Sequence, residues 1–139
     1  MKLLPVSLLC SAAAMLAACS AAPPGQMIQT PSSAEQAAVD SRRQTLLAGL
    51  APGTPQRCAD EVSDRTPLET VGRETILFRV SDELVYRNDP VGGCRHLRRN
   101  ASFIMQGPAC SGKVIEVRDG PVELGSCALG PFLPYRPVG

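Results

Sequence analysis

Residues 75–88, TILFRVSDELVYRN, decide the fold class of this 139-residue chain. In the first half, the apolar residues Ile76, Phe78 and Val80 fall on one face of an extended strand, because successive side chains of a strand alternate between faces. The second half, ELVYRN, follows after a short turn and has the composition of a partner strand. The stretch therefore predicts an antiparallel β-hairpin with one buried face.

Three further segments downstream of the hairpin have the composition of short strands, and turn residues separate them. They are ASFIMQG (101–107), KVIEVRD (113–119) and CALGPFLPY (127–135). The last is irregular, because Pro131 and Pro134 cannot donate to a β-ladder. Five short strands predict a mainly β domain over residues 58–135, folded as a small antiparallel five-stranded barrel or rolled sheet. Its core is expected to centre on the three phenylalanines, Phe78, Phe103 and Phe132.

A short helix over residues 34–50 is expected before this domain. Either Ser32 with Glu35 or Ser33 with Gln36 could form a capping box at its start. Apolar residues recur near helical spacing beyond it, and GLAPGTP (49–55) ends the helix with glycine and proline.

The N-terminus has the pattern of an export signal. Lys2 precedes an apolar run that ends at Leu16, which is too short to span a bilayer and typical of a signal peptide over residues 1–18. The run ends in LAAC (16–19), which resembles the lipobox of bacterial lipoproteins, where cleavage precedes the cysteine and the thiol is lipidated. Cys19 is therefore the expected lipid anchor, and residues 19–33 are expected to form a flexible tether. The alternative is ordinary cleavage a few residues later, which would discard Cys19.

Two or three acyl chains would hold the protein stably at a membrane. Ser20 follows the cysteine, whereas aspartate is the usual inner-membrane retention signal of enteric bacteria. We therefore expect a cell-envelope protein anchored on the periplasmic face of the outer membrane.

Four cysteines remain after Cys10 is removed with the signal and Cys19 is lipidated, and in an oxidising compartment they predict two disulfides. No C-x-x-C pair supports a redox or zinc site instead. If the strands form an up-and-down meander, two of the cysteines lie at the same end of the sheet. The expected pairs are Cys94–Cys127 and Cys58–Cys110.

Charge favours no nucleic-acid partner. The chain has 14 basic and 13 acidic residues, and loss of Lys2 with the signal makes it formally neutral, without the net basic face that nucleic-acid binding requires. The one basic cluster, CRHLRR (94–99), is expected to be a solvated loop. The alternative is contact with an anionic partner such as a lipopolysaccharide phosphate.

No catalytic arrangement stands out, and we expect neither an enzyme nor a metal or cofactor site. His96 is the only histidine and falls in the arginine-bearing loop, and no G-x-S-x-G motif is present. Paired carboxylates are the remote alternative, since they could serve a hydrolase. These are Asp60, Glu61 and Asp64 in one group and Asp82 and Glu83 in another.

Several segments in order, LLAG, TILFRV, VYRND, SF, IEV and CALGPFLP, together with the cysteine spacing, resemble a family of exported proteobacterial proteins of unknown function. Its members carry a domain of about this size behind a lipoprotein or secretory signal, and the resemblance covers Leu46 to Pro134. Two departures are Lys113, where many members have aspartate, and Pro131 within the C-terminal motif. The resemblance implies the same architecture and no catalytic residue, substrate or cofactor.

Taken together, these patterns predict a lipid-anchored, monomeric envelope protein that acts as a non-catalytic binding module for an envelope protein or peptidoglycan. The alternative is a structural lipoprotein that maintains the envelope without a discrete binding site.

Overall fold

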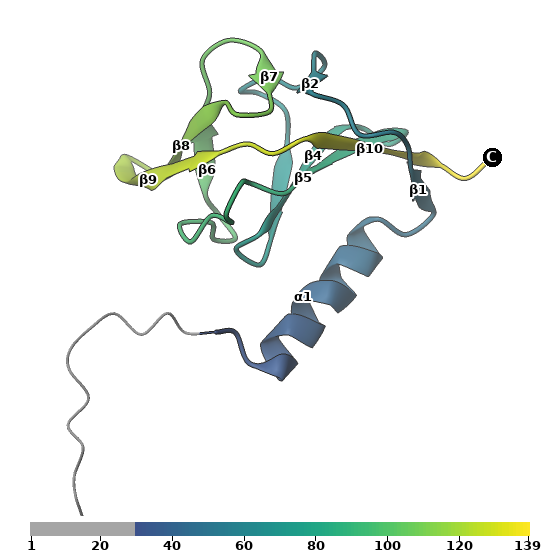
Figure 1. The fold of residues 1–139 in the computed structure, drawn as a ribbon, viewed down its shortest axis with the longest axis horizontal. Coiled ribbons are helices and arrows are strands. Elements are labelled where there is room, and N and C mark those ends of the chain that lie inside the picture. The colour runs from purple at the N-terminus through teal and green to yellow at the C-terminus, as the bar shows by residue number, and fades with distance from the viewer. Residues whose placement is uncertain (1–29) are drawn as a thin grey trace, which may run out of the picture. The chain divides into compact units, whose positions relative to one another are not determined.

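The computed structural model describes residues 30–139, in which one helix precedes a set of antiparallel strands (Figure 1). The helix, α1, comprises Ser33–Leu46. None of the helices within the described residues has the length and apolar character needed to cross a bilayer. The prediction of a mainly β domain with one preceding helix is confirmed.

Helix α1 begins with the first of the two possible capping boxes. The Ser32 hydroxyl accepts a hydrogen bond from the Glu35 backbone N–H at 3.2 Å, and the Glu35 carboxylate accepts one from the Ser32 backbone N–H at 2.8 Å. These hydrogen bonds lower the pKa of Glu35 below its usual value, because they favour the charged carboxylate.

The helix ends earlier than the expected residue 50. Leu47 caps it by donating to the Arg43 and Thr45 carbonyls, and Gly49 then adopts φ +78°, a left-handed conformation that favours glycine. This turn lets Leu50 begin a strand, so the predicted range of 34–50 was too long at its C-terminal end.

The largest sheet has five strands in the order β1-β10-β5-β4-β3, and every neighbouring pair is antiparallel. The predicted hairpin forms its centre, with Phe78 opposite Tyr86 in the register of β4 and β5. The strands are β1 (Leu50–Pro52), β3 (Leu68–Val71), β4 (Thr75–Ser81), β5 (Leu84–Asn88) and β10 (Phe132–Pro137).

Two smaller antiparallel sheets complete the domain. A three-stranded sheet has the order β6-β8-β9, and β2 pairs with β7 in a two-stranded sheet. The strands are β2 (Cys58–Ala59), β6 (Ser102–Ile104), β7 (Ala109–Cys110), β8 (Val114–Asp119) and β9 (Val122–Ala128).

The expected single meander is wrong, and among residues 30–139 the sheets do not close into a barrel. Strand β5 pairs with β10 instead of with the next segment of chain, and that segment is a strand only over Ser102–Ile104. The predicted strand 127–135 is divided between β9 and β10, because the chain leaves one sheet at Leu129 and joins the other at Phe132.

The two disulfides are Cys58–Cys110 and Cys94–Cys127, the same pairs that the meander favoured. Cys58 lies directly opposite Cys110 in the pairing of β2 with β7. The other disulfide joins β9 to the loop that follows β5, and both of its cysteines are buried. Each bridge therefore ties chain segments that are far apart in the sequence.

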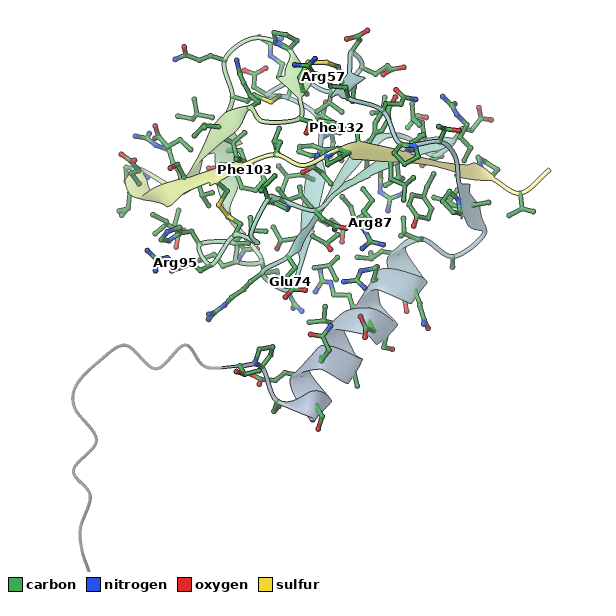
Figure 2. The ribbon with its side chains drawn as sticks, viewed as in Figure 1. Arg57, Glu74, Arg87, Arg95, Phe103 and Phe132 are labelled. Carbon is green, nitrogen blue, oxygen red and sulfur yellow. A yellow bond between two sulfur atoms is a disulfide. The ribbon has the colours of Figure 1, made fainter. Side chains whose placement is uncertain are left out.

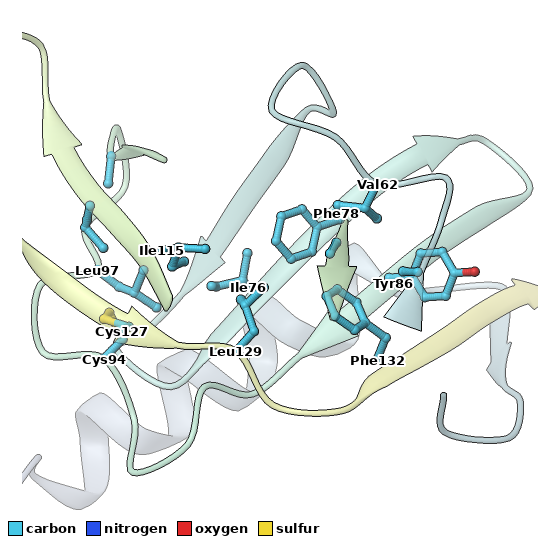
Figure 3. Packing of buried hydrophobic residues seen from close by; sticks show 14 of the residues in the cluster. Val62, Ile76, Phe78, Tyr86, Cys94, Leu97, Ile115, Cys127, Leu129 and Phe132 are labelled. Atoms are coloured by element: carbon cyan, nitrogen blue, oxygen red, sulfur yellow. A yellow bond between two sulfur atoms is a disulfide. The ribbon is translucent and has the colours of Figure 1, made fainter. Parts of the chain in front are cut away.

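The hydrophobic core lies between the five-stranded and three-stranded sheets (Figure 3). Phe132 is fully buried, and its ring centre lies 5.9 Å from that of Phe78 and 6.0 Å from that of Tyr86, in an edge-on arrangement with the tyrosine. Ile115 and Leu129 extend the same cluster toward the Cys94–Cys127 bridge. Two of the three expected aromatic anchors, Phe78 and Phe132, are thus central, whereas Phe103 is only partly buried.

A second, smaller cluster lies on the opposite face of the hairpin. Leu77 and Val85 are buried there, and Val39 and Leu46 of α1 pack against that cluster. The hairpin is therefore covered on both faces, by the core on one and by the helix on the other.

A buried asparagine fixes the crossing from β9 to β10. Asn88 is fully buried, and its side-chain amide donates to the Gly130 carbonyl at 2.7 Å while its side-chain oxygen accepts from the Gly130 N–H at 3.0 Å. A Cβ on Gly130 would collide with the Asp89 carbonyl oxygen, so only glycine fits this approach. The clamp between Asn88 and Gly130 positions the chain to pair with β5.

Candidate functional site

A groove of about 470 Å³ opens between the edge strands of the two larger sheets. Its floor is formed by the buried side chains of Phe78 and Ile115. Leu68 of β3 and Phe103 of β6 line it from the two edges, and both are partly buried against the core. Figure 2 labels Phe103 on its strand. The volume and the apolar floor are typical of a ligand-binding site.

The rim of this groove is polar and carries one charge of each sign, Asp64 and Arg99. Within residues 30–139 neither side chain forms a salt bridge, so both charges are available to a ligand. The other polar lining residues are Ser63, Thr66, Asn100 and Ser102, and the apolar residues Pro67, Ala101 and Met105 complete the lining.

Strands β3 and β6 each have a neighbour on one side only. An edge strand presents backbone N–H and C=O groups without strand partners, which is the basis of recognition by strand addition. The groove therefore combines apolar walls with two sheet edges that could pair with an extended chain.

The basic loop 94–99 is only partly the solvated loop that its composition predicts. Arg95, Arg98 and Arg99 are exposed, but Leu97 is 4% exposed and belongs to the core. The imidazole of His96 lies directly over Gly125 of β9, where any side chain would displace it, and its Nε2 lies 3.4 Å from Nε of Arg95. His96 thus faces an arginine and the backbone of β9.

The carboxylates considered as a possible hydrolytic pair lie in separate parts of the structure. Glu61 accepts a hydrogen bond from the Tyr86 hydroxyl at 2.9 Å, and burial together with this contact raises the pKa of Tyr86 above its usual value. Asp82 and Glu83 occupy the turn between β4 and β5, and Asp64 lies at the groove rim. Within the described part of the chain, no group of three or more potential metal-ligating residues comes together.

Sequence patterns missed the groove, because its walls come from segments more than thirty residues apart. Leu68 lies in β3, which was not predicted, and Phe103 was expected in the core. The expected lipidation site Cys19 and the signal peptide 1–18 lie outside the described residues, as does most of the tether 19–33.

Comparison with known proteins gives no match to the chain among protein-family models, curated proteins or solved structures.

Proposed function

We propose that this protein is a lipid-anchored cell-envelope protein whose folded domain is a non-catalytic binding module. The observation that carries the proposal is the groove between β3 and β6, with its apolar floor and a rim carrying Asp64 and Arg99. Its occupant is an extended segment of another envelope protein. The two flanking edge strands support this ligand, because they could hydrogen-bond to a peptide backbone while Leu68 and Phe103 contact alternate side chains.

The exposed apolar residues elsewhere on the described surface offer less for an extended peptide. The exposed large hydrophobic residues are Val91, Ile104, Val114, Val122 and Val138, and single residues of this kind are ordinary on protein surfaces. Ile104 and Val114 share a second, more open hollow, but its other lining residues are polar or charged. The groove is the better candidate, because its apolar floor continues into the core.

Photo-crosslinking in intact cells tests the binding module. A photoreactive phenylalanine analogue at Phe103 or Leu68, on the two walls, is expected to capture the same short segment of one exported protein, identified by mass spectrometry. The matched control carries the analogue at Val138, which is 70% exposed and lies beyond β10, next to the opposite edge of the five-stranded sheet. Equal capture from all three positions, or none from the walls, would favour the alternative of a structural lipoprotein without a discrete site.

The anchor is tested separately. Cys19→Ser is expected to abolish acylation and to leave the protein out of the membrane fraction or unprocessed, since the thiol would carry the lipid. Cys10→Ser, within the predicted signal, is the control and should mature normally. Recovery of a mature N-terminus beyond Cys19 from native membranes would contradict the anchor.

A further inference from the structure

A third hollow, of about 500 Å³, lies between α1, the turn from β3 to β4 and the loop 94–99. Three arginines from these three elements line it: Arg42, Arg73 and Arg99. Val39, Leu97 and Thr70 form much of the remaining lining, which contains no acidic residue. We call it the arginine hollow.

The helix and the turn that bear two of these arginines are in close contact. Gly72 adopts φ +63° in the turn, and a Cβ there would lie 3.1 Å from a methyl group of Val39. Because Gly72 lets α1 approach this closely, Arg42 on the helix and Arg73 on the turn line the same hollow. The arrangement is therefore set by backbone packing.

Nearby carboxylates compensate these charges only in part. Glu69 lies 3.5 Å from a terminal nitrogen of Arg42. The pKa of Glu35 is lowered by its hydrogen bonds with Ser32 and, after these, by the positive charge of Arg73. Arg73 and Arg99 form no salt bridge with any residue between 30 and 139. Nε of Arg42 is buried and has no hydrogen-bond partner in the same range. Most buried donors in folded proteins are hydrogen-bonded, and an ion or an ordered water at this nitrogen would satisfy it.

We propose that the arginine hollow binds a phosphate group. Three arginine side chains line the hollow, and positive charges gathered there repel one another. A dianion would offset that repulsion and could accept charge-assisted hydrogen bonds from them. The planar arginine fork matches phosphate oxygens in pairs. The phosphate could belong to a lipid headgroup of the membrane or to a soluble phosphate ester. The inference does not depend on the peptide-binding groove, although Arg99 borders both sites.

The test uses the full chain, purified in a non-ionic detergent and labelled with nitrogen-15. Inorganic pyrophosphate is titrated in one arm, and detergent micelles doped with phosphatidic acid in the other, with phosphatidylcholine as the neutral comparison. Ionic strength is held constant, because screening weakens exposed charge interactions. The readout is the side-chain Nε–H resonance of each arginine. We expect the resonances of Arg42, Arg73 and Arg99 to shift, and those of Arg57 and Arg65 to stay in place.

Two double variants distinguish binding at the arginine hollow from a general attraction of anions to the positive charges of the protein. R73Q/R99Q removes two exposed arginines of the hollow, and R57Q/R65Q removes two exposed arginines elsewhere. The first is expected to raise the dissociation constant about tenfold or more, the second to change it less than about twofold. Binding of pyrophosphate assigns a soluble phosphate ester, and binding of phosphatidic acid alone assigns a membrane headgroup. No shift with either probe, or equal weakening in both variants, would overturn the proposal.

Discussion

Replacement of Asn88 by alanine is expected to lower the free energy of unfolding by about 2–5 kcal/mol. The Asn88 amide satisfies both the N–H and the carbonyl of Gly130, and all of these groups are buried. Loss of the side chain leaves two backbone groups without partners, and each buried group of this kind costs about 1–3 kcal/mol. Chemical denaturation followed by circular dichroism measures the change.

Two further substitutions make this test specific. Asn100→Ala, in the exposed loop before β6, should change the free energy of unfolding by less than about 0.5 kcal/mol. Asn88→Asp keeps the acceptor for the Gly130 N–H but replaces the donor with a buried carboxylate facing the Gly130 carbonyl. Burial raises the pKa of such a carboxylate in the folded state above its unfolded value, so the variant should become more stable relative to the wild type as the pH falls toward 4. A loss in Asn88→Ala no larger than that in Asn100→Ala would show that the clamp does not hold the crossing.

Phe132→Ala is expected to lower the free energy of unfolding by about 3–5 kcal/mol, because it opens a cavity at the centre of the core. The ring is fully buried and packs against both Phe78 and Tyr86. The backbone of Phe132 also exchanges two hydrogen bonds with Gln56, at 2.7 and 2.8 Å, so a shift of this residue would disturb the chain beside β10. The variant should therefore unfold at markedly lower denaturant concentration.

Phe103→Ala is the matched control, since it removes the same side chain from a partly exposed position in the groove wall. Phe103→Ala should lower the free energy of unfolding by about half as much as Phe132→Ala or less, because the stabilisation by a side chain scales with the apolar area that it removes from water. Equal losses in the two variants would mean that Phe103 belongs to the core as first expected. A small loss would also make Phe103→Ala suitable for binding studies, because the fold would be retained.

The sequence by itself was sufficient for the features that depend on neighbouring residues. Alternating Ile76 and Phe78, followed by a two-residue turn at Asp82 and Glu83, specify the β4–β5 hairpin, because a strand and its partner are adjacent in the chain. The capping box of Ser32 and Glu35 is local for the same reason. The disulfide pairs were also predicted correctly, but from a meander that the structure does not have. In the structure, Cys58–Cys110 instead depends on the pairing of β2 with β7, which was not predicted.

The pairing of strands beyond the hairpin depends on contacts between residues that are distant in the sequence. Strand β10 could have continued the sheet of β9, but the clamp of Asn88 on Gly130 and the burial of Phe132 favour pairing with β5 instead. These contacts join residues more than forty positions apart. They cannot be recognised from the periodic spacing of apolar residues, because that spacing reflects only neighbouring positions in the chain. The groove and the arginine hollow arise in the same way, since each is lined by elements that become neighbours only when separate parts of the fold pack together.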